Sequence, residues 1–224
     1  MKCKFVIALT FGASVLSAAE PDAPKRLEAA AAAFKEVMGI PDKSIPQDLL
    51  NKAQCIVVVP DLKKGALIIG AKYGKGFVSC RKKDGVGWTA PASIRVEGGS
   101  FGLQIGGTET DVFMLVMNQK GRDRLLASKF TLGGDVTAAA GPVGRSTQAE
   151  TDATMNAEIL TWSRARGLFA GISLSGATLR EDSDWNNELY GRKISNREIL
   201  TSDVAPPQPA GVWLSELNRY SSRK

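Results

Sequence analysis

The stretch Cys55-Ile-Val-Val-Val59, followed by Pro60-Asp61, decides how the fold is interpreted. A short apolar run rich in β-branched residues is typical of a buried strand. Proline followed by aspartate is typical of a turn, so Pro60-Asp61 predicts the end of this strand. We therefore expect a β-rich region that begins near Cys55.

Further extended segments follow this run, separated by glycines that favour turns. Gly106-Gly107-Thr108 in particular indicates a turn between two of them. The expected extended segments cover residues 66–71, 76–81, 88–96, 101–105, 112–117, 155–162 and 168–175.

Helical patterns flank the β-rich region. Apolar residues, Leu27 and Phe34 among them, recur at helical spacing from Pro24 to Met38, after Asp22 as a cap and before Gly39 as a stop. The apolar face of this helix suits packing on the core, or contact with a membrane. Further helices are expected at residues 44–53, 121–126, 184–190, 196–200 and 212–220.

The order of these elements predicts the fold class. Strands and helices do not alternate, so a doubly wound parallel sheet is disfavoured. We expect an α+β protein with an antiparallel β-rich core of many short strands, on which N-terminal and C-terminal helices pack. Residues 20–224 form one domain, with a core at about 25–200 and a proline-rich linker and C-terminal helix at 204–224.

Residues 1–19 have the pattern of a secretory signal peptide. Lys2 and Lys4 precede an apolar run, and Ser17-Ala18-Ala19 supplies the small residues expected before a cleavage site. The alternative is a membrane anchor, but the run is shorter than the roughly 20 apolar residues that span a bilayer. We expect a periplasmic or secreted product that can associate peripherally with a membrane.

Two cysteines, Cys55 and Cys80, remain after cleavage at this site. In an oxidising compartment they can form a disulfide, which we predict. The alternative is a pair of buried free thiols.

Composition and motifs argue against an enzyme. The chain has no histidine, which excludes Ser-His-Asp and Cys-His catalytic arrangements and His-bearing zinc sites. The segment from Gly70 to Gly76 has one residue too few for a phosphate-binding loop, and no spacing singles out a catalytic pair among the carboxylates. We expect neither a catalytic site nor a cofactor or metal.

Basic residues are concentrated in one part of the sequence, although the net charge of the chain is only +6. Lysines at turns can mark a solvated sheet edge that discourages edge pairing. They can instead attract anionic lipid headgroups, at about 1 kcal/mol per basic residue. The export signal and the small net charge disfavour nucleic acid. The basic residues are Lys63, Lys64, Lys72, Lys75, Arg81, Lys82 and Lys83.

Several segments, in this order and spacing, resemble the SYLF domain family. They include Ile45-Pro46, Cys55-Ile-Val-Val-Val59-Pro60, Gly70-Ala-Lys-Tyr-Gly74-Lys-Gly76-Phe77, Trp88-Thr-Ala-Pro91-Ala, Gly102-Leu-Gln-Ile-Gly106, Ala138-Ala-Ala-Gly141-Pro142, Ser163-Arg-Ala-Arg-Gly167-Leu168-Phe169 and Asn187-Glu-Leu-Tyr190-Gly191. The resemblance covers about residues 25–200.

The SYLF resemblance implies lipid binding, with the N-terminal amphipathic helix involved, so Leu27 and Phe34 join the basic residues as candidate lipid contacts. Eukaryotic members bind phosphoinositides and some bind actin, whereas bacterial members are exported or lipid-anchored. For an exported chain we therefore expect no actin partner.

Two functions follow from these arguments. The first is a non-enzymatic module that binds anionic phospholipid at a membrane surface in the bacterial envelope, mainly through its lysines. The alternative is a structural or partner-protein-binding envelope protein without direct lipid contact.

Overall fold

A computed structural model of the chain describes residues 22–66, 69–101, 106–144 and 156–221. The predicted signal peptide at 1–19 lies outside these residues, as does most of the extended segment expected at 101–105.

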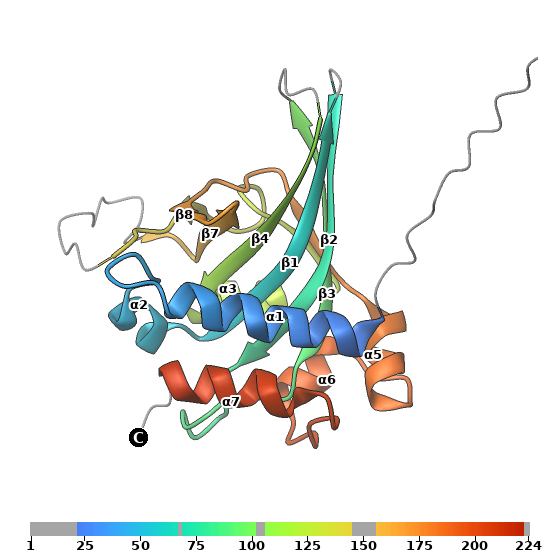
Figure 1. The fold of residues 1–224 in the computed structure, drawn as a ribbon. Helices are drawn as coiled ribbons and strands as arrows, with labels where there is room; N and C mark the ends of the chain where they lie inside the picture. Colours follow the sequence, from blue (N-terminus) through green and yellow to red (C-terminus); the bar gives the residue numbers. More distant parts are fainter. Residues whose placement is uncertain (1–21, 67–68, 102–105, 145–155, 222–224) are drawn as a thin grey trace, which may run out of the picture.

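A curled nine-stranded sheet forms the centre of the described protein, with helices from both ends of the chain packed against it (Figure 1). This arrangement confirms the predicted α+β class. The strands are β1 (Cys55–Ala66), β2 (Ile69–Cys80), β3 (Ala92–Phe101), β4 (Gly106–Val116), β5 (Lys129–Thr131), β6 (Ala138–Ala140), β7 (Ile159–Ala165), β8 (Leu168–Gly171) and β9 (Thr178–Glu181). The helices are α1 (Ala23–Met38), α2 (Gln47–Lys52), α3 (Gln119–Leu125), α5 (Ser183–Tyr190), α6 (Asn196–Thr201) and α7 (Ala210–Ser221).

The strands pair in the order β5-β9-β3-β2-β1-β4-β7-β6, and β8 pairs with β7. All of these pairings are antiparallel except that between β6 and β7. The four central strands are longer than the sequence indicated, with 12, 12, 10 and 11 residues in β1 to β4.

Pro60-Asp61 does not end β1, as the sequence predicted. The strand continues through a bulge, where its register against both neighbouring strands shifts and Asp61 has a φ of 48°. Arg26 of α1 donates hydrogen bonds of 3.1 Å to the Pro60 carbonyl and to the Asp61 carboxylate. The bulge therefore accommodates the proline, and α1 supplies a partner for backbone that the ladder leaves unpaired.

Glycines that indicated turns lie inside strands. Gly74 is in the middle of β2, where an added Cβ would come within 2.8 Å of the Leu62 side chain. Gly106, Gly107 and Thr108 belong to β4 rather than to a turn. At Gly74 the glycine provides space for the close approach of the bulged strand β1, so it marks packing and not a chain reversal.

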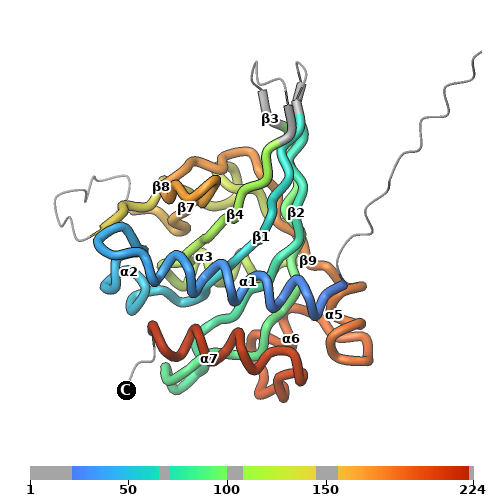
Figure 2. Tube along the Cα trace, viewed as in Figure 1, coloured from blue at the N-terminus to red at the C-terminus, as the bar shows by residue number. Residues whose placement is uncertain are grey.

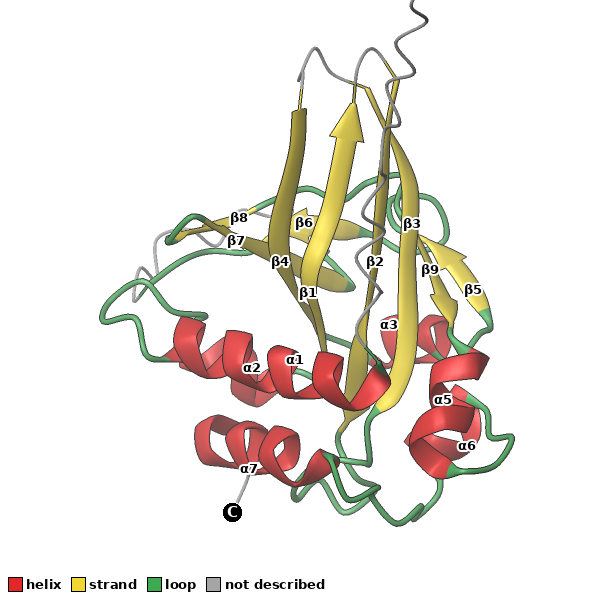
Figure 3. Ribbon diagram, turned by 45° about the vertical axis from the view of Figure 1, so that its right-hand side comes forward, coloured by secondary structure: helices red, strands yellow, loops and turns green. Residues whose placement is uncertain are grey.

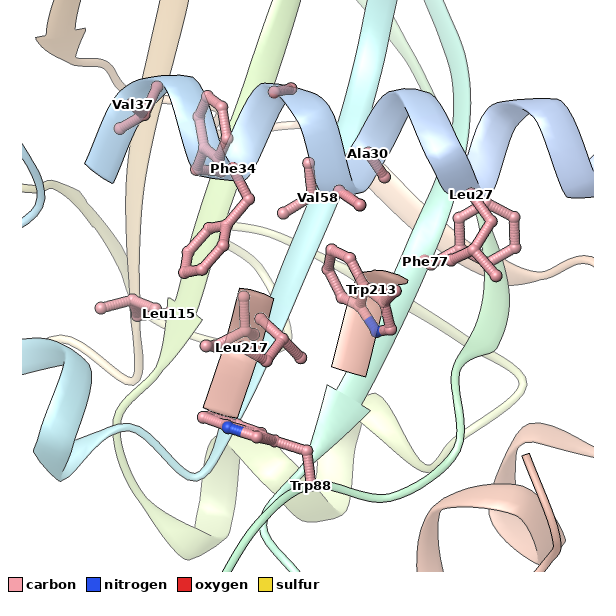
Figure 4. Packing of buried hydrophobic residues seen from close by; sticks show 14 of the residues in the cluster. Leu27, Ala30, Phe34, Val37, Val58, Phe77, Trp88, Leu115, Trp213 and Leu217 are labelled. Carbon is pink, nitrogen blue, oxygen red and sulfur yellow. The ribbon is translucent and has the colours of Figure 1, made fainter. Parts of the chain in front are cut away.

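The sheet has an apolar core on each face. On one face, α1 and α7 lie side by side and pack their apolar residues onto the sheet (Figure 3). Figure 4 shows Phe34 and Trp213 from these two helices beside Val58 and Leu115 of the sheet. The opposite face packs against the segments that carry β5, β9 and α6, including Phe130, Leu179 and Ile199.

Cys55 and Cys80 face each other directly in the β1–β2 ladder, and both are fully buried. The structure joins them in a disulfide with an S–S distance of 2.03 Å. The sequence left open a disulfide or two free thiols, and the structure has the disulfide.

In the described part of the chain, none of the helices combines the length and the apolar character needed to cross a membrane.

Candidate binding surfaces

Leu27 and Phe34, the predicted lipid contacts on the N-terminal helix, lie inside the protein. Both side chains are fully buried between α1, α7 and the sheet (Figure 4). Phe34 has its ring centroid 6.4 Å from that of Trp213 and 6.0 Å from that of Tyr220. The apolar face of α1 is therefore core in this structure, which corrects its placement at a membrane.

Arg81 is also buried, with an exposed fraction of 2%. Its guanidinium carbon lies 3.8 Å from the centroid of the Trp88 ring. It donates hydrogen bonds to the carbonyl oxygens of Ala53, Leu50 and Ser221 and to the Ser221 hydroxyl. These contacts tie the end of β2 to α2 and α7, so Arg81 acts within the fold and not at a lipid surface.

Lys75 is a fourth predicted lipid contact whose side chain is largely buried. Its side chain is 13% exposed, and its Nζ atom lies 3.4 Å from the Asp182 carboxylate and 4.4 Å from the centroid of the Trp185 ring. Because this charge is paired and shielded, it has little capacity to attract an external anion.

Three of the remaining lysines lie where β1 to β4 extend beyond the body of the protein, a region we call the ribbon (residues 63–66, 69–73, 98–101 and 106–109). Figure 2 shows these strand ends projecting past α1. In the described residues, β9 pairs with β3 only as far as Glu97, and β7 pairs with β4 only from Asp111 onward. The outer strands of the ribbon are therefore sheet edges. The three lysines are Lys63, Lys64 and Lys72.

Lys64 and Lys72 are directly opposite each other in the β1–β2 ladder, so their side chains project from the same face of the ribbon. Both are half-buried. Burial, followed by the nearby charge of Lys72, lowers the pKa of Lys64 from its ordinary value. Lys63, by contrast, is opposite Tyr73 and Glu109 and projects from the other face.

Lys82 and Lys83 are exposed in the connection between β2 and β3. They line a pocket of about 380 Å³ together with Arg122, which sequence reasoning did not single out. Arg122 lies on α3, about forty residues downstream in the chain, and only the tertiary fold brings it to the same pocket. The complete lining is Arg81, Lys82, Lys83, Asp84, Thr89, Arg122, Leu200, Thr201, Ser202 and Asp203.

Several carboxylates of the described residues form ion pairs or cap helices. Asp111 accepts hydrogen bonds from Arg164 and from the backbone of Asp61, while burial raises its pKa. In this part of the chain, no group of three His, Cys, Asp or Glu residues is arranged to hold a metal ion.

Comparison with known proteins identifies similar chains. Residues 97–220 match the family described as Ysc84, Las17-binding protein actin regulator. The chain is 36% identical over 178 residues to SH3 domain-containing protein PJ696.02 of Schizosaccharomyces pombe, covering 78% of this chain and 41% of that protein. It is 34% identical over 184 residues to SH3 domain-containing YSC84-like protein 1 of Homo sapiens, covering 82% and 53% respectively.

A third relative is LAS seventeen-binding protein 3 of Saccharomyces cerevisiae, 34% identical over 170 residues, with 74% of this chain and 36% of that protein covered. The chain thus spans only between about a third and just over half of the length of these relatives. The expectation of no actin partner is wrong for this group of proteins, because the matched family is described as an actin regulator.

Proposed function

We propose that this chain, which belongs to the Ysc84 (SYLF) family, is a non-catalytic module that binds a partner protein of the actin-regulating class through its ribbon. Binding is the activity for which the family and the yeast relative are described. We infer that this chain also binds a protein partner, and that the ribbon is the surface that binds it.

The observation that carries the proposal is the Lys64–Lys72 pair on the ribbon. Like charges directly opposite each other destabilise a sheet. Neither lysine has a carboxylate within 4.0 Å among the described residues, so the fold itself does not compensate the repulsion. An acidic surface on a partner would supply the missing counter-charge, and local rules are most often broken at functional sites.

Edge strands of the ribbon add a second reason to expect a protein partner. A sheet edge presents backbone donors and acceptors that an extended segment of another protein can pair with.

The experiment is co-sedimentation of the chain with actin filaments, together with retention on immobilised yeast Las17. We expect retention on at least one of them at low salt, declining as added salt shortens the Debye length from about 10 Å at 0.1 M to about 3 Å at 1 M. The double variant Lys64→Glu/Lys72→Glu should lose retention. The matched control is Lys129→Glu/Lys193→Glu, which reverses the charge of two exposed lysines outside the ribbon. Absence of retention on both, or equal retention of the double variant, would contradict the proposal.

An anionic membrane surface is the second candidate. Lys63, Lys64, Lys72, Lys82 and Lys83 reach the surface, and none has a carboxylate within 4.0 Å among the described residues. Each can contribute about 1 kcal/mol near an anionic bilayer. Retention on phosphatidylserine vesicles but not on phosphatidylcholine vesicles would support this candidate. Equal retention on both would exclude an electrostatic mechanism.

A further inference from the structure

We propose that the pocket lined by Lys82, Lys83 and Arg122 binds a phosphate group. This site is separate from the ribbon, and the inference does not depend on the proposed partner protein. It rests on the volume of the pocket, on the elements that supply its cations, and on the absence of ion-pair partners for these cations among the described residues.

The cations reach the pocket from different parts of the fold. Lys82 and Lys83 come from the connection after β2, Arg122 comes from α3, and the end of α6 completes the wall with Leu200 and Thr201. A phosphate group has several oxygens that accept charge-assisted hydrogen bonds from different directions. A guanidinium can also bind two of those oxygens at once. A volume of about 380 Å³ leaves room for a group attached to the phosphate.

These three cations lack ion-pair partners although carboxylates are close. Some exposed cations of the described residues do form ion pairs: Lys25 pairs with Asp22, and Lys120 with Glu158. Lys82, Lys83 and Arg122 have no carboxylate within 4.0 Å in that part of the chain, although Asp84 and Asp203 line the same pocket. Their charge is therefore available to a ligand.

The loop that carries the two lysines is held in place by its own hydrogen bonds. The Gly85 backbone N–H donates to the Lys82 carbonyl at 2.9 Å, and the Val86 N–H donates to the Asp84 carboxylate at 3.0 Å. Gly85 and Gly87 have φ values of 78° and 73°, which glycine adopts without strain. Just before the loop, Arg81 fixes the chain to the interior. A loop fixed in this way loses less entropy when it binds a ligand.

Asp84 and Asp203 limit the affinity that can be expected. The Asp84 carboxylate already accepts a hydrogen bond from the Val86 N–H, whereas Asp203 is exposed to solvent. Both carboxylates weaken the positive potential that the three cations create. We therefore expect moderate, salt-dependent binding that favours pyrophosphate over inorganic phosphate, because the larger anion carries more charge.

Isothermal titration of the full chain with pyrophosphate is the first test. Because a hydrogen bond to a charged group contributes about 1.5–3 kcal/mol, Arg122→Ala should weaken binding by about tenfold or more. Lys82→Ala/Lys83→Ala should do the same. The matched control is Arg124→Ala, an exposed arginine of the same helix that does not line the pocket. Circular dichroism should show that all variants fold.

A second arm identifies the source of the phosphate. Vesicles containing phosphatidic acid carry the group on a lipid, whereas pyrophosphate carries it in solution. Loss of vesicle retention in Arg122→Ala, but not in Arg124→Ala, would identify a lipid headgroup as the source. If Arg122→Ala weakens pyrophosphate binding, while vesicle retention is absent or is unchanged in this variant, the ligand is a soluble phosphate compound.

The proposal is overturned if neither pyrophosphate nor the vesicles bind, or if Arg122→Ala and Arg124→Ala bind equally well. The Lys64→Glu/Lys72→Glu variant separates this site from the ribbon. It should lose the partner protein but keep its affinity for pyrophosphate, so either proposal can fail without the other.

Discussion

The guanidinium of Arg81 stacks on the Trp88 ring while it donates hydrogen bonds to both the carbonyl and the hydroxyl of Ser221, 140 residues away in the sequence. This pair of contacts joins the end of β2 to the end of α7. The C-terminal helix is thereby fixed at its far end, while Trp213 fixes its first half by donating from its Nε1 atom to the Ser79 hydroxyl at 2.9 Å.

We predict that Arg81→Ala destabilises the protein by about 3 kcal/mol, because it leaves buried carbonyl oxygens without donors and opens a cavity beside Trp88. Urea unfolding measures the free energy of unfolding. The adjacent exposed residue provides the control: Lys82→Ala should change stability by no more than about 0.5 kcal/mol. Similar stabilities for the two variants would contradict the role assigned to Arg81.

Much of the fold could be predicted from local patterns. The helix expected at 24–38 is α1 at Ala23–Met38, and the helix expected at 212–220 is α7 at Ala210–Ser221. Caps and apolar periodicity are local properties, so they are visible in the sequence. The short strands β5 and β6 were missed, because three residues are too few for periodicity and their pairing depends on distant segments.

The binding surfaces could be predicted only in part. The sequence identified Lys82 and Lys83, but it also placed Arg81 at the surface, because arginine is seldom fully buried without partners. Its partners are carbonyl groups of α2 and α7, which no local pattern reveals. No local sequence pattern indicated that Arg122 belongs to the pocket either, because it lies far from Lys82 in the sequence and reaches the pocket through the packing of α3.

The Cys55–Cys80 disulfide should contribute about 3 kcal/mol to stability, as the chain-entropy model gives for a loop with a sequence separation of 25 residues. The double variant Cys55→Ala/Cys80→Ala should therefore unfold at a lower urea concentration than the oxidised protein. Reduced wild-type protein should behave like the variant. If reduction leaves the urea midpoint unchanged, the bond does not constrain the unfolded chain as predicted.

Glu158 should make stability fall in acid. Burial disfavours its charge, but hydrogen bonds from Lys120 and from the Thr137 backbone outweigh burial and hold its pKa below the ordinary value of 4.5. Because the pKa of Glu158 is lower in the folded protein than in the unfolded chain, the ionised carboxylate stabilises the fold fully above pH 4.5. This stabilisation is lost as the pH falls through the folded-state pKa.

Glu158→Gln should therefore be less stable than wild type at neutral pH, and this difference should shrink as the pH falls below 4.5. Urea midpoints measured from pH 7 to pH 3 test this prediction. Glu109→Gln, at an exposed carboxylate on the ribbon, is the control for replacing a carboxylate by an amide. A constant difference between Glu158→Gln and wild type across this range would show that the ionisation of Glu158 does not contribute.

The N-terminus provides the prediction that separates the two candidate functions. The pattern of Lys2, Lys4 and the small residues Ser17-Ala18-Ala19 predicts export with cleavage after Ala19, whereas the proposed partner of the actin-regulating class predicts an uncleaved chain in the cytosol. If the chain is exported, the intact mass of the protein recovered from its native cells should correspond to a chain that begins at Glu20. Because an exported chain is separated from cytosolic actin, that result would favour the anionic membrane surface as its target. A mass that includes Met1 or Lys2, from protein recovered in the cytosol, would contradict export and favour the actin-related partner.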